Sequence, residues 1–181
     1  MRAVVQRVTS ASVTVDGQVI SQISRGLMVL VDDTESDVST LTNKILTLRV
    51  FSDPTDSAKM WKTSVKDIDG DILCVSQFTL MAQTKKGSKP DFHNAMSTEP
   101  SRTLYETFLE TMRRSYKPEK VQDGKFGAMM NVSLTNEGPV TFTLDSRRFE
   151  YTPEPAVGGT KKPKIQLSGD TIAQHSPARA Q

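Results

Sequence analysis

The residue types best suited to chemistry follow directly on an apolar run. Residues 72–75 have the composition of a buried strand, and Ser76, Gln77 and Thr79 come immediately after it. Two hydroxyls and an amide would thus stand where a strand emerges, a position that often presents backbone N–H groups to a ligand. In so short a motif, a polar strand end that merely caps a sheet is the commoner explanation.

A second feature is Gly138-Pro139, inside the polar stretch 136–139 between two alternating apolar segments. Glycine and proline in a link between strands usually form an ordinary turn. The alternative is that the bond before Pro139 is cis, as only about 5–6% of X–Pro bonds are, and that its carbonyl groups gauge a bound ligand. The sequence does not specify the isomer.

Hydrolysis would require a group that activates a nucleophile. A threonine hydroxyl such as that of Thr79 is a weak nucleophile without an adjacent base, and the chain holds only two histidines. His175 lies near the end of the chain, and His93 lies in a polar loop, where we expect an ordinary surface residue. We therefore expect Thr79 to position a substrate rather than to form a covalent intermediate.

Three lysines, Lys85, Lys86 and Lys89, surround Gly87 close to the first motif. They could contact the phosphates of a nucleic acid, with a solvated loop as an equally weighted alternative. The single cysteine, Cys74, is expected to be a small core residue. No cluster of His, Cys and carboxylate side chains has zinc spacing, and no glycine-rich phosphate loop occurs, so we expect neither a metal nor a cofactor.

Hydrophobic periodicity predicts the elements that must hold these groups. Asp16-Gly17 predicts the turn of a hairpin, and spacings of three and four residues predict two helices. The expected elements are a hairpin at 12–23, strands at 27–31 and 72–75, helices at 38–48 and from 98 onward, and two separate strands at 130–134 and 140–144. Residues 36–37 are expected to cap the first helix. One face of the first strand is expected to carry Val4, Gln6 and Val8, then Ala11, Val13 and Val15.

The 181 residues suit one domain followed by a tail. We expect a domain at 1–146 with an α/β (α+β) fold, in which mainly antiparallel strands form a barrel-like core flanked by two principal helices. Residues 147–181 are rich in proline, glycine and polar residues and are expected to be disordered. They carry a net charge of +3, which leaves −1 on the rest, so bulk charge does not indicate a nucleic-acid coat.

Targeting signals are missing from the sequence. The longest apolar run, at 26–31, is far shorter than the roughly 20 residues of a membrane helix, and the first residues do not form a secretory signal. A single cysteine also agrees with a reducing compartment. We therefore expect a cytoplasmic protein without a membrane partner.

Several ordered motifs resemble those of the D-aminoacyl-tRNA deacylases. The similarity extends from residue 1 to about residue 146. It is carried by residues 1–8, 49–53, 76–80 (Ser-Gln-Phe-Thr-Leu), 87–92, 124–130 and 136–141 (Asn-Glu-Gly-Pro-Val-Thr). So many motifs in one order are highly specific to this family.

The resemblance implies an enzyme that cleaves the ester between a D-amino acid, or glycine, and the terminal ribose of tRNA. It implies a homodimer in which Gly138-Pro139 of one subunit, with a cis bond, enters the pocket of the other and rejects L-amino acids by overlap. Ser76, Gln77, Phe78 and Thr79 would form the catalytic segment, and the N–H groups near Phe78 and Thr79 would stabilise the oxyanion. The 2′-hydroxyl of the tRNA would help to activate water.

Two rival interpretations remain at this point. One is a nucleic-acid-binding module that kept the fold but lost hydrolysis, which the basic tail and the missing side-chain base favour. The other is a structural dimer without a ligand. The intact residues of both motifs favour the enzyme.

Overall fold

β1 (Arg2–Val15) is the strand around which the sheet is organised. A computed structural model describes residues 1–32, 38–85 and 87–146, and in it β1 pairs antiparallel with three partners. These partners are β2 (Gln18–Ile23), β3 (Gly26–Asp32) and β6 (Asn131–Asp145). β4 (Asp71–Ser76) then pairs parallel with β3, and β5 (Val121–Asp123) pairs parallel with β4.

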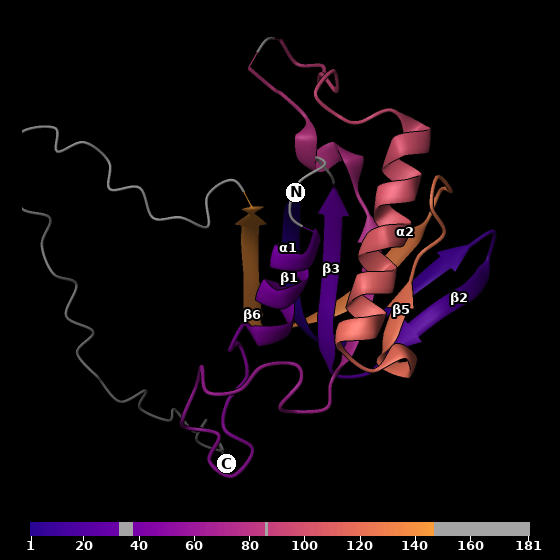
Figure 1. Ribbon diagram of the computed structural model, residues 1–181. Helices are drawn as coiled ribbons and strands as arrows, with labels where there is room; N and C mark the ends of the chain where they lie inside the picture. Colours follow the sequence, from indigo (N-terminus) through magenta and orange to yellow (C-terminus); the bar gives the residue numbers. More distant parts are fainter. Residues whose placement is uncertain (33–37, 86, 147–181) are drawn as a thin grey trace, which may run out of the picture. The chain divides into compact units, whose positions relative to one another are not determined.

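The sheet is mixed and strongly curved, so that it nearly closes into a barrel (Figure 1). Three of its five pairings are antiparallel, which confirms the expected mainly antiparallel core. β4 lies between β3 and β5, is buried along Ile72–Val75, and ends at its polar residue Ser76. A strand buried on both sides reads as a continuous apolar run, which is why its position was predictable.

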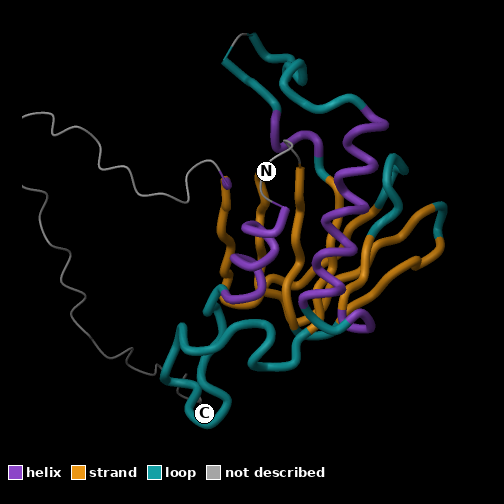
Figure 2. Tube along the Cα trace, in the orientation of Figure 1, coloured by secondary structure: helices purple, strands orange, loops and turns teal. Residues whose placement is uncertain are grey.

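Both principal helices lie over the same face of the sheet and contact each other (Figures 1 and 2). α1 (Val38–Thr47) buries Leu41 and Ile45, and α2 (Thr98–Ser115) buries Tyr105, Phe108 and Met112. Two short 3₁₀ turns complete the fold, η1 (Phe78–Met81) and η2 (Pro118–Lys120). The two helices and the single-domain architecture are as expected.

The hairpin turn confirms the interpretation of Asp16-Gly17. Both residues adopt positive φ, at 51° and 78°, the backbone that a two-residue turn between twisted strands requires. The inward face of β1 is predicted correctly from Val8 onward and wrongly before it. Ala3 and Val5 are buried instead of Val4 and Gln6, because register shifts against β6 on both sides of Val8 change the phase of the strand.

The last two expected strands are in fact one. β6 runs from Asn131 to Asp145 without a chain reversal and pairs with β1 on both sides of residues 136–139. The segment around Gly138-Pro139 is therefore an irregularity within one long strand, and the prediction of a turn between two strands was wrong. Polar turn-forming residues mark a break in pairing, and a bulge breaks pairing as a turn does.

Some expectations fall outside the described residues. These are the helix cap at 36–37, Lys86, His175 and the tail at 147–181. Within the described part of the chain, none of the helices has both the length and the apolar character needed to cross a bilayer.

Candidate active site

The segment 76–80 lies where β4 ends and the chain tightens into η1. The Gln77 N–H donates to the carbonyl of Val31 at 2.8 Å, which fixes the turn to the end of β3. The Leu80 N–H then donates to the Gln77 carbonyl at 3.1 Å and closes the 3₁₀ turn. The first N–H groups of such a turn, those of Phe78 and Thr79, have no acceptor within the turn and are available for other hydrogen bonds.

Thr79 is exposed, and its side chain is hydrogen-bonded to the neighbouring amide of Gln77. The Gln77 Nε2 donates to the Thr79 Oγ1. An amide that donates in this way orients the hydroxyl but cannot accept its proton. The arrangement favours a positioning role for Thr79 over that of an activated nucleophile.

A cavity of about 370 Å³ opens beside this segment, and we call it the motif cavity. Ser76 and Phe78 line it from the motif, and Tyr105 and Phe126 line it with their rings. The two rings lie 5.8 Å apart, and the guanidinium of Arg102 lies 4.8 Å from the centre of Phe126. Such a space, apolar with few polar groups, suits a flat ring that carries polar substituents.

A carboxylate also borders the motif cavity. Asp32, the last residue of β3, is only 4% exposed and lines the cavity together with Val31 and Ser76. Sequence reasoning did not single it out, since a single aspartate at a strand end carries no spacing signal. Its carboxyl group is thus one of the polar groups that line the cavity.

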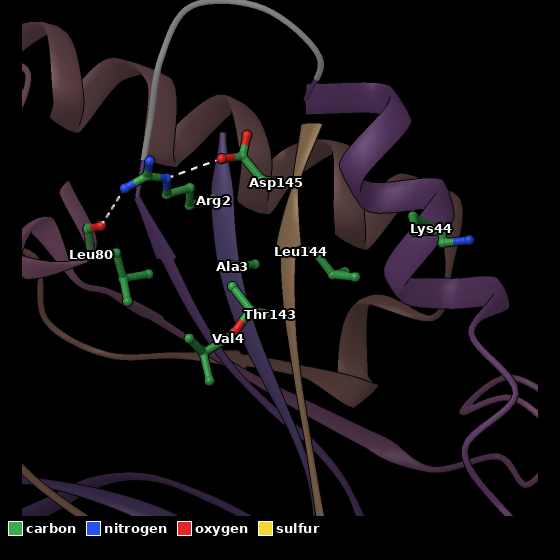
Figure 3. A pocket seen from close by; sticks show the side chains of 8 residues that line it. All are labelled: Arg2, Ala3, Val4, Lys44, Leu80, Thr143, Leu144 and Asp145. Atoms are coloured by element: carbon green, nitrogen blue, oxygen red, sulfur yellow. Dashed lines mark hydrogen bonds and ion pairs between the residues drawn. The ribbon is translucent and has the colours of Figure 1, made fainter. Parts of the chain in front are cut away.

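Arg2 forms hydrogen bonds to both η1 and the end of β6. Its Nη1 donates to the Leu80 carbonyl at 2.9 Å and its Nε to the Asp145 carboxylate at 3.1 Å (Figure 3). These residues border a hollow of about 650 Å³ that also exposes Lys44 of α1. Arg2 therefore links the candidate catalytic turn to the end of β6.

The second motif is built differently, and its Gly138–Pro139 bond is cis. Gly138 has a φ of +123°, and both residues are exposed. The side chain of Asn136 holds the segment from within: its Oδ1 accepts from the Val140 N–H at 2.8 Å, and its Nδ2 donates to the Thr141 Oγ1 at 3.0 Å.

Two arginines hold this segment from outside. Arg7 donates from Nε to the Glu137 carbonyl at 3.2 Å and from Nη1 to the carbonyl of Val50. Arg25 makes a bidentate contact with the Glu137 carboxylate, at 3.0 and 3.2 Å, and lies over the ring of Phe51. A bidentate contact orients the carboxylate as well as pairing its charge, so both oxygens of the Glu137 carboxylate are held.

The structure does not bring the two motifs together within one chain. Glu137 is bound to Arg25, which precedes β3, whereas Gln77 is bound to Val31 near the other end of β3. Val31 comes six positions after Arg25 along this extended segment, a span of roughly 20 Å. Gly138-Pro139 of one chain therefore lies far from the motif cavity of the same chain.

The other candidates lie on a loop next to η1. Lys85 and Lys89 are exposed there. His93 receives a contact from the Asp91 carboxylate at its Nδ1, at 2.7 Å, and its backbone N–H donates to the same side chain at 2.9 Å. These hydrogen bonds lower the pKa of Asp91. Burial raises the pKa of Cys74 to about 12, which makes it an inert core thiol.

Comparison with known proteins identifies the family. The family model for D-Tyr-tRNA(Tyr) deacylase matches residues 4–145, most of the chain. The chain belongs to the D-Tyr-tRNA(Tyr) deacylase family. The resemblance based on the two motifs is thereby confirmed.

Individual deacylases match over most of their length. The chain is 53% identical over 150 residues to the D-aminoacyl-tRNA deacylase of Saccharomyces cerevisiae, which covers 81% of this chain and 99% of the yeast protein. It is 51% identical over 172 residues to D-aminoacyl-tRNA deacylase 1 of Homo sapiens, which covers 93% of this chain and 77% of the human protein.

Two solved structures share the fold. One, titled "c-Myc DNA Unwinding Element Binding Protein", is 53% identical with a TM-score of 0.76 and covers 81% of this chain and 99% of its own. The other, titled "Structural Analysis of a probable eukaryotic D-amino acid tRNA deacylase", has a TM-score of 0.67 at 19% identity. It covers 79% of this chain and 97% of its own, and it supports the deacylase fold alone.

Within this deacylase fold, sequence reasoning located the motifs but missed their supports. Arg7 and Glu137 lie in the motif segments 1–8 and 136–141, but no role was predicted for either side chain, and Arg25 lies outside every motif. A signal did exist for Phe126, because it lies in the glycine-rich segment 124–130, which is one of the family motifs. Among the described residues, no group of three His, Cys, Asp or Glu side chains is placed to hold a metal ion.

Proposed function

We propose that this protein hydrolyses the ester bond of D-aminoacyl-tRNA, and of mischarged glycyl-tRNA, and releases free tRNA and the amino acid. The observation that carries the proposal is the segment 76–80, which places Ser76 and Phe78 on the lining of the motif cavity in a chain of this family. Removal of wrongly charged tRNA is a quality-control step of translation. We place it in the cytoplasm, where a buried lone cysteine would stay reduced.

The chemistry follows from what the turn offers. A water oxygen attacks the ester carbonyl, and the carbonyl oxygen becomes an oxyanion that the N–H groups of Phe78 and Thr79 stabilise. Each such donor is typically worth roughly 3–4 kcal/mol in the transition state. The C–O bond to the ribose then breaks, and the ribose oxygen leaves with a proton. Ser76 and the Gln77–Thr79 pair hold the carbonyl in place.

Activation of water falls to the substrate in this proposal. His93, the one histidine within the described part of the chain, is occupied at Nδ1 by Asp91 on an exposed loop. The hydrogen bond to the Thr79 hydroxyl comes from the neighbouring Gln77 amide, which donates to it and cannot act as a base. The terminal 2′-hydroxyl of tRNA, next to the ester, is therefore the group that assists water.

We further propose that a second copy of the chain completes each site and sets its chirality. Gly138-Pro139 is exposed and is held by Arg7 and Arg25 through Glu137, whereas the motif cavity adjoins Val31 and Asp32 at the other end of β3. Only a partner subunit can bring this motif to that cavity. Rigid backbone there would leave room for the hydrogen of a D-amino acid or glycine and would collide with an L side chain.

Lysines on the loop beside η1 support a tRNA partner. Lys85 and Lys89 are exposed close to the site, and Lys86 lies between them in sequence. We propose that they contact phosphates of the acceptor stem, which would contribute affinity without reading sequence.

One assay tests the activity. The protein is incubated with D-aminoacyl-tRNA, the L counterpart and glycyl-tRNA, and the ester remaining is followed with time. Loss of the D and glycyl esters with the L ester spared is the expected result. Equal loss of D and L esters would refute the chirality proposal, and no loss of any ester would refute hydrolysis.

A second candidate is DNA or RNA binding without hydrolysis. The observation in its favour is the solved structure at 53% identity whose title names a DNA unwinding element binding protein. Binding of nucleic acid with every ester intact in the same assay would support this candidate.

A further inference from the structure

The loop between η1 and α2 is a defined arm. We use this name for residues 83–95. The backbones of Gln83 and Asp91 exchange two hydrogen bonds, of 2.8 and 2.9 Å, which close the arm at its base. The arm projects beyond the strand ends, at the top of Figure 2. The hydrogen bonds from His93 to Asp91 stiffen its return segment.

An exposed aromatic pair joins the arm to the candidate catalytic turn. The ring of Phe92 lies 5.1 Å from that of Phe78, with a tilt of 60°. Phe78 is 55% exposed and Phe92 is 37% exposed, although large apolar side chains are usually buried. Exposed aromatic faces beside basic residues are typical of sites that stack single-stranded bases.

Two hollows are lined by residues of η1 and of the return segment of the arm. Phe78, Ala95 and Met96 line the motif cavity. Asn94, the residue before Ala95, lines a second hollow of about 540 Å³ together with Met81 of η1 and Lys85 of the arm. We call this second space the arm hollow. The turn η1 and the return segment of the arm therefore separate the two spaces.

The arm hollow has the chemistry of a phosphate site. Lys85 brings positive charge to it, Arg2 brings a guanidinium that is paired with Asp145, and Gln83, Thr84 and Asn94 bring amide and hydroxyl donors. None of the described residues that line it is a carboxylate. The motif cavity, by contrast, carries the buried Asp32 and two aromatic rings. A nucleic-acid strand that ends in a flat, neutral ring and carries an anionic phosphate one step before it matches the motif cavity and the arm hollow, in that order.

We propose that Phe92, with Phe78, stacks the unpaired nucleotide that precedes the aminoacylated end of tRNA, and that the arm hollow binds its phosphate. This inference rests on the proposed function and extends it from the reacting ester to the adjoining single strand. Stacking tolerates any base, because every base has a π face. The site would thus read the presence of an unpaired nucleotide and not its sequence.

The test compares two substrates with the full-length protein. One is D-aminoacyl-tRNA, and the other is the D-aminoacyl ester of adenosine alone, which lacks the preceding nucleotide. Phe92→Ala is expected to lower kcat/KM for the tRNA by about 5- to 150-fold, the usual effect of one lost stacking contact, and to lower it much less for the adenosine ester. Phe92→Trp is expected to restore most of the preference for tRNA.

Lys85 and a matched control complete the design. Lys85→Gln is expected to reduce the dependence of tRNA binding on salt concentration by the share of about one phosphate, a change of about 0.7 in logarithmic slope for a single strand. Lys66→Gln removes an exposed lysine from the loop between α1 and β4, at the opposite end of the sheet (Figure 2), and is expected to leave that slope as it was.

Each outcome decides the inference. Equal losses on both substrates after Phe92→Ala would overturn it, as would a tRNA preference that Phe92→Leu retains in full, since leucine keeps apolar packing without an aromatic face. Thermal unfolding of each variant identifies a misfolded protein, in which case Phe92→Leu and Phe92→Trp carry the comparison. If the unaltered protein cleaves neither ester, the proposed function fails. If the unaltered protein and the Phe92→Ala variant cleave both esters equally well, only the stacking inference fails.

Discussion

The clearest prediction concerns Glu137, because its contacts with two arginines hold the segment that contains Gly138-Pro139. Glu137→Gln keeps the shape of the side chain and removes its charge. The contact with Arg25, at 3.0 Å, is half exposed and is worth about 0.2–1 kcal/mol. The contact with Arg7, at 3.6 Å, is less exposed, so the two together amount to roughly 1–2 kcal/mol.

That loss has two expected readouts. The melting temperature should fall by roughly 2–8 °C, from about 2–4 °C per kcal/mol for a domain of this size. The second readout is functional. Arg7 still donates to the Glu137 carbonyl, so the segment stays folded, but Gly138-Pro139 is held less firmly. L-aminoacyl-tRNA should therefore be cleaved faster relative to D-aminoacyl-tRNA in single-turnover assays.

A matched control separates stability from positioning. Asp69 also contacts two cations, Lys117 at 2.9 Å and Lys120 at 3.9 Å, and it is far more exposed than Glu137. Asp69→Asn should lower the melting temperature slightly and leave the ratio of L to D cleavage as it was. The reasoning is refuted if Glu137→Gln keeps the parental ratio, or if Asp69→Asn changes the ratio as much.

Four further predictions concern other residues. Pro139→Ala frees the φ angle that proline fixes, so cleavage of the L ester should rise about tenfold relative to the D ester; unchanged sparing in the same assay would contradict the gate. Thr79→Ala should slow cleavage about tenfold, not the roughly 10⁶-fold expected for a lost nucleophile, and an acyl-enzyme isolated by mass spectrometry at Thr79 would disprove the positioning role. Neutralising Lys85 and Lys89 together should flatten the salt dependence of tRNA affinity, and an equal slope would remove them from the interface. Cys74, with a pKa of about 12, should resist alkylation at pH 8 until denaturant is added, which intact-mass measurement checks; rapid labelling of the folded protein would show that it is not buried.

Local pattern was enough to predict the elements that depend on local physics. The positive φ of Asp16 and Gly17 followed from their types, and the apolar run of β4 followed from burial on both sides. The phase of β1 before Val8 did not, because a register shift is fixed by the partner strand. The single strand β6 was predicted as two strands for a similar reason, because a polar interruption looks the same in sequence whether it forms a turn or a bulge.

The candidate site divides along similar lines. Its motifs were visible because several unusual residues stand together at 76–80 and 136–141. Arg7, Arg25 and Asp32 were not visible, because each is one charged residue in a strand or next to one, and its role depends on a partner far along the chain. Pairing between residues far apart in the chain is determined by the fold and produces no characteristic spacing in the sequence.

The length of β3 has a consequence for complementation between alleles. It keeps Gly138-Pro139 and the motif cavity of one chain at opposite ends, so that a functional site draws on two polypeptides under the proposed pairing. An allele damaged at Ser76 would lose cleavage, and an allele damaged at Gly138 would lose the sparing of L esters. Expressed together, they would form mixed dimers in which one pocket is intact and receives an intact gate, so the two defects would complement each other.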